Sequence, residues 1–247
     1  MTNISTIYED ENILVIDKPA GLIVNRADTT KNVETIQQWA EGKIGIDVNK
    51  VTNESSEFER RGGIVHRLDK ETSGCMIIAK NETSFVNLQG QFKQGLVSKT
   101  YVFLSHGKIV PETGEINVPI GRLPWNRMRF GILPAGREAK TQYKVIGYKK
   151  LKVEKSEEVF TLAEAYPKTG RTHQIRVHML HVGHPLFADV LYGGRKNIKS
   201  DRQFLSRHFL HASKIEFAHP KNQEMLSFES SMPTELEDFL QKLVSFV

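Results

Sequence analysis

Two stretches of the sequence are dense in residues that can do chemistry but are poor at building a hydrophobic core. The first, residues 62–74, reads GGIVHRLDKETSG and places a histidine, an arginine and an aspartate close together. A carboxylate such as that of Asp69 can act as a nucleophile or stabilise a developing positive charge. The residues alone also allow a structural interpretation, in which Asp69 and Thr72 bind the backbone amides of a turn.

The second stretch, residues 166–178, reads YPKTGRTHQIRVH and lies at the start of an expected helix. Three cations and two threonines near a helix N-terminus favour a phosphate contact. Helical spacing places Arg176 on one face with His173 and Leu180, while residues 175, 179 and 182 share another. One face can therefore pack while the other offers a cation to a cleft. A solvent-exposed face is the alternative interpretation.

These stretches must be positioned by strands and helices of an α+β fold, because the two kinds of element do not alternate regularly. Residues 7–19 read as a hairpin, and Val33, Ile36 and Ala40 recur at helical spacing. The polar residues 42–61 are expected to form a surface loop. Strand-like character returns over residues 68–79, and a helix is expected from an N-cap at Asn81 to Gly95.

Further along the chain, the pattern predicts strands over residues 99–105, 141–147 and 159–165, and a helix from about 172 to 182. Near the C-terminus, apolar residues share one face that is expected to pack back on the body of the protein: Leu236, Phe239, Leu240 and Leu243.

Composition limits the function classes that remain. The 247 residues, 39% of them hydrophobic, can form one sizeable core or two lobes packed across a cleft. A net charge of +5 suits a polyanionic partner. The single cysteine, Cys75, excludes an intramolecular disulfide and a cysteine-rich zinc site, and its apolar surroundings predict burial. The apolar run nearest the N-terminus, residues 13–16, is too short for a signal peptide or membrane span, which predicts a cytoplasmic protein.

The order of the motifs resembles that of the RluA-type pseudouridine synthases. HRLD at residues 66–69 followed by TSG at 72–74 resembles the central motif of that family, and GRTHQIRVH at 170–178 resembles another block. Shorter blocks agree as well: DKPAG at 17–21, KTY at 99–101, GHP at 183–185, DVLYG at 189–193 and LHA at 210–212. The histidine at 66 favours this type over the related RsuA branch. Two departures are Phe187, where a smaller aliphatic residue is usual, and Ala188, where glycine is common.

The resemblance implies a mixed, largely antiparallel sheet flanked by helices, with a central catalytic cleft. It also implies conversion of uridine to pseudouridine, in which the N1–C1′ bond breaks, the uracil rotates and C5 joins the sugar. This reaction needs no cofactor or metal, and the sequence contains no P-loop, dinucleotide fingerprint or metal-ligand pattern. Asp69 matches the catalytic aspartate, Arg176 its arginine partner, and Tyr101 the tyrosine that stacks on uracil. Without the resemblance, Tyr101 would be an ordinary strand aromatic. Whether Asp69 attacks the sugar or the base stays open.

The substrate uridine lies in folded RNA, so the base must be flipped out of its stack. Arg67 resembles the family residue that enters the vacated space, although a salt bridge to Glu71 is the alternative. The residues expected to contact RNA are His66, Arg67, Thr72, Lys99, Arg171, Thr172, His173 and Gln174. The segment between Arg122 and Lys152 contains many basic residues and only one acidic residue, Glu138. This segment is either a surface that binds the RNA backbone or a solvated face.

We therefore expect residues 1–247 to form a single catalytic domain with no N-terminal S4 domain, acting on ribosomal or transfer RNA. A monomer with no obligatory protein partner is expected. Two rival functions remain. A metal hydrolase would use some of the crowded histidines 173, 178, 181 and 184, but no His-Glu-x-x-His pattern is present. An RNA-binding module with a dead site would lack the aspartate or the arginine, and the sequence has both.

Overall fold

The computed structural model describes residues 4–26, 33–153 and 156–246. The chain divides into two compact units: unit 1 comprises residues 1–98 and 213–231, and unit 2 comprises residues 99–212 and 232–247. The chain therefore passes from one unit to the other three times. Strands and helices are mixed in both units, which confirms the α+β fold. The single catalytic domain stays a prediction.

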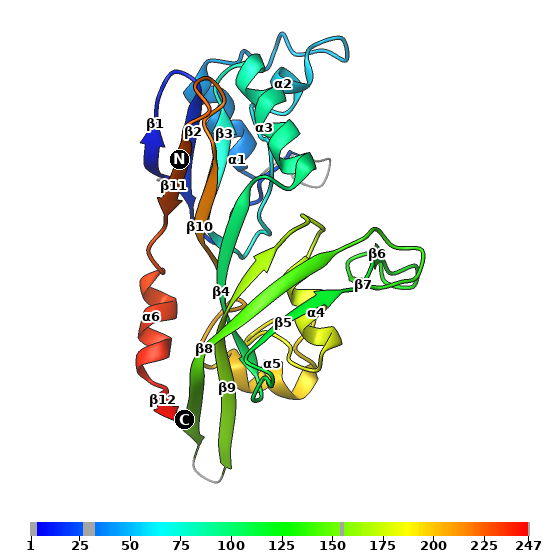
Figure 1. Cartoon of the computed structure of the whole chain (residues 1–247), viewed down its shortest axis with the longest axis vertical. Coiled ribbons are helices and arrows are strands. Elements are labelled where there is room, and N and C mark those ends of the chain that lie inside the picture. Colours follow the sequence, from blue (N-terminus) through cyan, green and yellow to red (C-terminus); the bar gives the residue numbers. More distant parts are fainter. Residues whose placement is uncertain (1–3, 27–32, 154–155, 247) are drawn as a thin grey trace. The chain divides into compact units, whose positions relative to one another are not determined.

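Unit 1 is built on an antiparallel sheet whose first two strands form the expected hairpin (Figure 1). β1 (Ser5–Glu9) pairs with β2 (Ile13–Lys18), and the Asp10 carboxylate closes the turn by accepting from the Asn12 and Ile13 amides. β3 (Ser73–Ala79) pairs with β2, and β10 (Leu210–Ala218), which begins in unit 2, follows β3 in the strand order. β11 (Met225–Glu229) pairs with β10.

Helices cover both faces of this sheet, because side chains of a strand alternate between its faces. Ile77 of β3 packs in one cluster with Phe85 of α3 (Glu82–Gln94), whereas its neighbour Ile78 packs in another with Ile36 of α1 (Ile36–Ile44). Every residue of β3 is buried as a result. The strand thus gives residues 66–72, which precede it and are mostly polar, a rigid attachment.

Local signals predicted the ends of α3 correctly. The Asn81 side chain accepts from the Ser84 amide as N-cap, and Gly95 ends the helix in the left-handed conformation. The prediction for α1 was wrong at its start, since the helix begins at Ile36 after a capping box formed by Thr35, and Val33 is exposed outside it. Residues 42–61 were also wrong as a continuous loop, because they contain the end of α1 and the short helix α2 (Glu57–Arg60).

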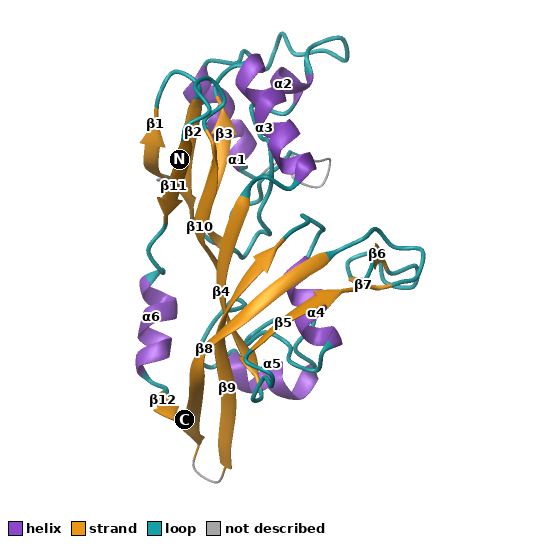
Figure 2. Ribbon diagram, in the orientation of Figure 1, coloured by secondary structure: helices purple, strands orange, loops and turns teal. Residues whose placement is uncertain are grey.

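Unit 2 contains a second group of antiparallel strands (Figure 2). Their order is β4 (Ser98–His106), β9 (Ser156–Pro167), β8 (Lys140–Val153) and β12 (Val244–Phe246). β5 (Thr113–Asn117) pairs with β8, and β6 (Ile120–Arg122) forms a separate hairpin with β7 (Phe130–Ile132). β8 and β9 extend well beyond the predicted residues 141–147 and 159–165, because the two strands pair along most of their length.

The helices of unit 2 are α4 (Gln174–His181), α5 (Arg195–Asp201) and α6 (Thr234–Gln241). Met179 of α4 packs with Phe103 of β4, and Phe239 of α6 packs in a different cluster with the neighbouring Leu104. The predicted packing of the C-terminal apolar face is confirmed. α4 begins later than predicted, because His173 has a left-handed φ of 58°. No helix in the described part of the chain is long and apolar enough to cross a membrane.

Candidate active site

Asp69 lies in unit 1 on a tight turn that leads directly into β3. The Thr72 amide donates to the Asp69 carbonyl at 3.1 Å, which closes the turn over residues 69–72. Asp69 is half-buried, whereas Thr72 and the strand that follows are buried. A carboxylate at this position has a fixed backbone and remains within reach of a substrate.

Lys18, at the end of β2, holds this turn in place through hydrogen bonds from its ammonium group. Its fully buried ammonium group donates to the carbonyl oxygens of Pro19 at 2.8 Å, Lys70 at 3.1 Å and Thr72 at 2.9 Å. The Gly21 amide adds a bond to the Lys70 carbonyl at 2.8 Å. A buried ammonium is tolerated only when its three N–H groups find acceptors, so this arrangement strongly favours one conformation of the turn.

The motifs did not identify Lys18, although the sequence around it carried a usable signal. Leu14 and Ile16 are buried, and Lys18 continues the same alternation along β2. A lysine at an inward position of a strand must find several acceptors. Its partners at positions 70 and 72 are remote in sequence and could not be identified from the pattern.

His66 and Arg67, two of the predicted RNA-binding residues, have different environments. The Nε2 atom of His66 accepts from the Ile77 amide at 2.9 Å, and its ring stacks on Phe92 with centroids 4.5 Å apart. Arg67 is exposed, and it forms no ion pair or hydrogen bond with any other described residue. The alternative salt bridge between Arg67 and Glu71 does not form. Glu71 instead lies 3.8 Å from Lys70.

Arg176 lies in unit 2 on α4 and makes a buried ion pair with Asp189. Its Nε donates to Oδ2 at 2.7 Å and its Nη2 to Oδ1 at 2.9 Å. The guanidinium carbon also lies 5.0 Å from the centroid of the Tyr192 ring. This burial excludes the alternative of a solvated helix face, because the arginine is only 4% exposed.

Asp189 holds Arg176 in place, although from the sequence it was noted only as part of a short block. Burial would raise the pKa of its carboxyl, but the hydrogen bonds and charge of Arg176 outweigh burial and hold the pKa below its ordinary value. The Leu191 and Tyr192 amides also donate to Oδ1, at 3.0 and 3.1 Å. The carboxylate is therefore ionised and anchors Arg176 to the backbone that follows α4.

Ala188 explains why glycine is common at its position in the family that the sequence resembles. Its φ is 58°, in the left-handed region that glycine adopts without steric cost. The preceding departure, Phe187, is buried and stacks on Phe239 with ring centroids 4.5 Å apart. The larger residue at position 187 thus anchors this segment on α6.

The loop before α4 is organised by Gln174, which was predicted to contact RNA. Its side-chain oxygen accepts from the Thr169 hydroxyl at 2.6 Å and the Arg171 amide at 3.0 Å. Its amide nitrogen donates to the Lys140 carbonyl at 3.0 Å and the Thr141 hydroxyl at 2.9 Å. Gln174 is buried and shapes the loop that carries Arg171, so its own contact with RNA stays a prediction.

His173 and Thr172 complete this loop beside the start of α4. The Nδ1 atom of His173 lies 2.8 Å from the Tyr192 hydroxyl, which also accepts from the Phe130 amide at 3.0 Å. Thr172 is half-buried. The hydrogen bonds of Tyr192 thereby link the loop to strand β7.

Tyr101 and Lys99 lie near the start of β4. Tyr101 is half-buried opposite Ala165 of β9, and it packs against the cluster that contains Met179. Burial, reinforced by the charge of Lys168, lowers the pKa of Lys99 to about 8. Lys99 therefore loses its charge in a pH range where other lysines keep theirs.

The residues predicted to be catalytic are divided between the two units, and each unit positions its own. Asp69 is positioned by Lys18 in unit 1, while Arg176 and Tyr101 belong to unit 2 and Arg176 is positioned by Asp189. The expected pairing of Arg176 with Asp69 stays a prediction.

The crowded histidines of the rival metal hydrolase are used in other ways. Both nitrogens of His178 contact protein oxygens, Thr141 Oγ1 at 2.9 Å and the Val118 carbonyl at 3.2 Å. Burial lowers the pKa of His178, so its ring is neutral at pH 7. The Nδ1 atom of His184 lies 2.9 Å from the His106 carbonyl. No metal-binding group of three or more among the described residues includes these histidines.

Comparison with known proteins agrees with the fold and the motifs. A family model described as RNA pseudouridylate synthase matches residues 12–181. The ribosomal large subunit pseudouridine synthase D of Buchnera aphidicola subsp. Schizaphis graminum is 38% identical over 246 residues, covering 96% of this chain and 72% of that protein. The uncharacterized RNA pseudouridine synthase YlyB of Bacillus subtilis is 36% identical over 239 residues, covering 96% and 71%.

Solved structures share the fold. Human RNA pseudouridylate synthase domain containing 1 superposes with a TM-score of 0.72 at 24% identity, covering 99% of this chain and 89% of that one. Some relatives are considerably longer, since this chain covers only 64% of the ribosomal large subunit pseudouridine synthase D of Nitrosomonas europaea.

The fold and these matches define an RNA-modifying enzyme. The chain belongs to the RNA pseudouridylate synthase family, and its resemblance to the RluA type is confirmed. It is an isomerase that acts on uridine in RNA.

Proposed function

We propose that Asp69 is the catalytic carboxylate of this isomerisation. The observation that carries the proposal is the position of Asp69, half-buried on a turn whose carbonyl groups are held by the buried Lys18. The carboxylate either attacks the substrate or stabilises the sugar as the N1–C1′ bond breaks. The uracil then rotates, C5 joins C1′, and the C5 proton leaves while N1 gains one. No other atoms enter or leave.

Arg176 and Tyr101 complete the proposed catalytic group. Asp189 accepts two hydrogen bonds from Arg176 and fixes the orientation of its guanidinium group. Contact of this group with Asp69 would keep that carboxylate ionised inside a closed site. Tyr101 would stack on the uracil and assist removal of the C5 proton. Replacing Arg176 with alanine is expected to cause severe loss of turnover, and wild-type rates in that variant would show that the pair does not form.

Arg67 is proposed to enter the space that the flipped uridine leaves in the RNA. Its exposure and its lack of any partner among the described residues support this role. An unpaired arginine can stack on bases and bind phosphate without first breaking an internal ion pair.

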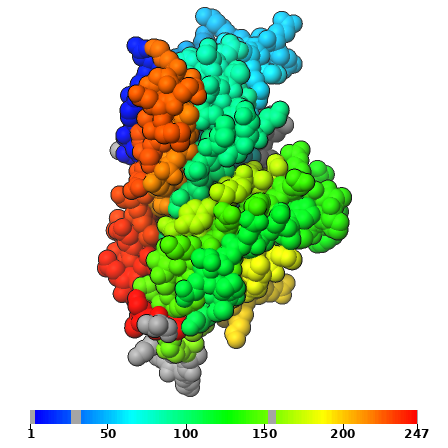
Figure 3. Space-filling view, viewed as in Figure 1, coloured from blue at the N-terminus to red at the C-terminus, as the bar shows by residue number. Residues whose placement is uncertain are grey.

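The β6–β7 hairpin is the proposed RNA-contacting part of the basic segment between Arg122 and Lys152. Its tip projects from the green part of the surface in Figure 3 and carries Trp125, which is 76% exposed, and the exposed Arg127. Exposed aromatic and arginine side chains are typical of surfaces that stack on RNA bases. In contrast, Lys140 and Lys150 on β8 are paired with acids from other strands, at 2.8 and 3.0 Å.

This surface can be tested through the salt dependence of RNA binding. Replacing Arg127 with alanine should reduce the slope of log affinity against log salt by about 0.7 to 0.9, the effect of one lost phosphate contact. Replacing Lys150 with alanine is the matched control and should leave the slope unchanged. Equal changes of this slope for the two substitutions would show that the hairpin does not contact the RNA.

The proposed substrate is ribosomal RNA of the large subunit, because several relatives are named for it. Incubating the protein with RNA tritiated at uridine C5 tests both activity and target. Release of tritium from large-subunit ribosomal RNA is the expected result. Release from transfer RNA alone would redirect the target, and release from neither would contradict the proposed function. The monomeric state and the cytoplasmic location stay predictions.

A further inference from the structure

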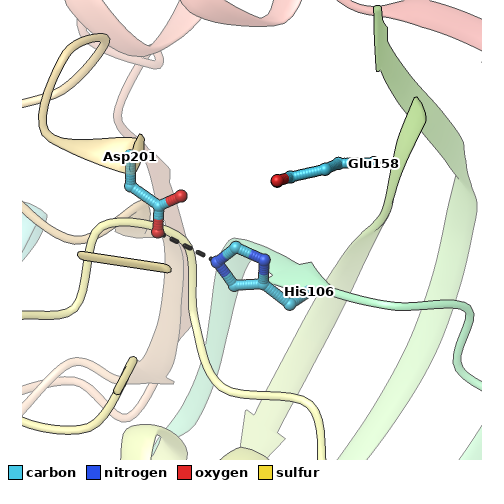
Figure 4. Close-up of side chains that lie close together, drawn as sticks. All are labelled: His106, Glu158 and Asp201. Atoms are coloured by element: carbon cyan, nitrogen blue, oxygen red, sulfur yellow. Dashed lines mark hydrogen bonds and ion pairs between the residues drawn. The ribbon is translucent and has the colours of Figure 1, made fainter. Parts of the chain in front are cut away.

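We propose that His106, Glu158 and Asp201 bind one divalent transition-metal ion in unit 2. They belong to three elements that are separate in sequence: β4, β9 and α5 respectively. One ligand atom from each residue lies within 4.8 Å of the others, and within the described chain no other group of three or more such side chains meets this condition. Figure 4 shows the Glu158 carboxylate directed toward Asp201 and His106.

Asp201 provides the observation that points to a cation as the ligand of this cluster. Its side chain is fully buried, and Oδ2 accepts from the Ala188 amide at 2.8 Å and lies 2.9 Å from His106 Nε2. Oδ1 is buried as well, yet no described residue gives it a hydrogen bond. A buried carboxylate oxygen without a donor carries a large desolvation cost, which a bound cation would remove.

The surroundings of Glu158 lead to the same conclusion. This half-buried carboxylate forms no hydrogen bond or ion pair with any described residue, although it lies beside a second carboxylate. The rings of Phe160 and Phe187 flank His106 and supply no charge. The contact of His106 Nε2 with Asp201 is made to Oδ2 and leaves Oδ1 without a partner among the described residues.

The chemistry of the donors selects the class of ion. One imidazole nitrogen and two carboxylate oxygens suit Zn²⁺ or Mn²⁺ and leave positions for water. Ligand atoms about 2.1 Å from one ion lie roughly 3.4 to 4.2 Å apart. The ligand atoms lie within 4.8 Å of one another, so they must approach by up to about 1.4 Å. No hydrogen bond from Glu158 to a described residue opposes its movement.

Such an ion would stabilise the segment that positions Arg176. Asp201 accepts from the amide of Ala188, and the next residue, Asp189, holds the guanidinium group. The ion would tie this segment to β4 and β9 without touching the residues proposed for catalysis. Its role would be structural, and its existence is independent of the proposed role of Asp69.

The test is a titration of the chelator-stripped full chain with Zn²⁺, followed by calorimetry and thermal unfolding. One equivalent should bind, and a stoichiometric excess of ion should raise Tm by about 3 to 8 °C. Replacing Glu158 with glutamine should weaken binding at least tenfold and remove most of the rise in Tm. Glu157 is the matched control, because it is the next residue on the same strand, is exposed and pairs with Lys150. Glu157→Gln should bind Zn²⁺ as the wild type does.

Absence of Zn²⁺ binding by the wild type would overturn the proposal. Binding of equal strength by the wild type and Glu158→Gln would do so as well, because the ion would then occupy other histidines. In the absence of metal, Glu158→Gln should unfold at the wild-type Tm or above it, since the change removes repulsion between two carboxylates. If that variant fails to fold, His106→Gln takes its place with the same expected loss of binding.

Discussion

The guanidinium group of Arg176 and the carboxylate of Asp189 form a two-point ion pair inside unit 2, with side chains only 5% and 0% exposed. Two backbone amides also donate to the same carboxylate. Asp189 therefore fixes the orientation of the arginine that is proposed to face the catalytic carboxylate. Asp189 thereby controls the position of Arg176 without a proposed contact of its own with the substrate.

Replacing Asp189 with asparagine should lower the free energy of unfolding by about 3 to 5 kcal/mol, because it leaves a buried guanidinium without its counter-charge. Turnover should fall together with stability. Urea unfolding at pH 7 measures the first effect and tritium release the second. Glu115→Gln is the control, since it removes an exposed pair with Lys140 and should cost at most about 1 kcal/mol.

The same pair predicts a dependence of stability on pH. The folded-state pKa of Asp189 lies below its ordinary value of 3.8, so its carboxylate stabilises the fold above that pH. This contribution is lost as the pH falls through the folded-state pKa. The free energy of unfolding of Asp189→Asn should therefore change less steeply than that of the wild type below about pH 4. Parallel curves for the two proteins would show that Asp189 is not held ionised.

Replacing Ala188 with glycine should stabilise the protein by about 0.5 to 1 kcal/mol. The left-handed backbone at this position costs alanine about 1 to 2 kcal/mol, which glycine would not pay. Part of the stabilisation is offset by the greater entropy of glycine in the unfolded chain. Ala163, buried in β9 without a positive φ, is the matched control, and glycine there should destabilise. A loss of stability in Ala188→Gly would mean that the backbone at this position is not strained.

Replacing Lys18 with methionine keeps the length of the side chain but removes the donor shared by three carbonyl groups. Removing the Lys18 donor from the buried Thr72 carbonyl should cost about 1 to 3 kcal/mol, and the turn that carries Asp69 should loosen because its bonds to Pro19 and Lys70 are lost as well. We expect turnover to fall by more than the unfolded fraction explains, measured by tritium release under conditions where the variant remains folded. Wild-type turnover in the folded variant would show that Lys18 does not position Asp69.

Lys99 predicts a weakening of RNA binding at alkaline pH. The free protein holds the pKa of Lys99 at about 8, so the cation is lost as the pH rises through that value. Bound phosphate would favour the charged form, and the affinity should fall by up to about tenfold per pH unit above pH 8. Arginine at this position stays charged, so Lys99→Arg should flatten the profile measured by filter binding. Identical profiles would place Lys99 outside the interface.

Local signals in the sequence predicted the parts of the fold that depend on neighbouring residues. The Asn81 cap, the end of α3 at Gly95 and the end of β3 at Ala79 are of this kind. The predicted strand over residues 68–79 was wrong at its start, because β3 begins only at Ser73, after the turn that carries Asp69. Lys18 and Asp189 depend instead on partners that lie elsewhere in the chain, and the division into two units depends on many such contacts. Those features could not be derived from spacing.

The order of the motifs predicted the isomerisation of uridine, which the spacing of individual residues did not indicate. From its neighbours alone, Asp69 was interpreted as a turn residue in preference to a catalytic one, and the structure shows that it does belong to a turn. The two interpretations are not exclusive, because the turn is what places the carboxylate. The match to the family model and to named relatives supports the activity. The role of Asp69 is a proposal for experiment.

The most direct measurement is release of tritium from C5-labelled RNA by Asp69→Asn, with RNA binding measured in parallel. Glu71→Gln on the same turn is the matched control, since it makes the same chemical change two residues away. The account predicts no release above background by Asp69→Asn, RNA affinity within about tenfold of the wild type, and normal release by Glu71→Gln. Wild-type release by Asp69→Asn would contradict the central claim.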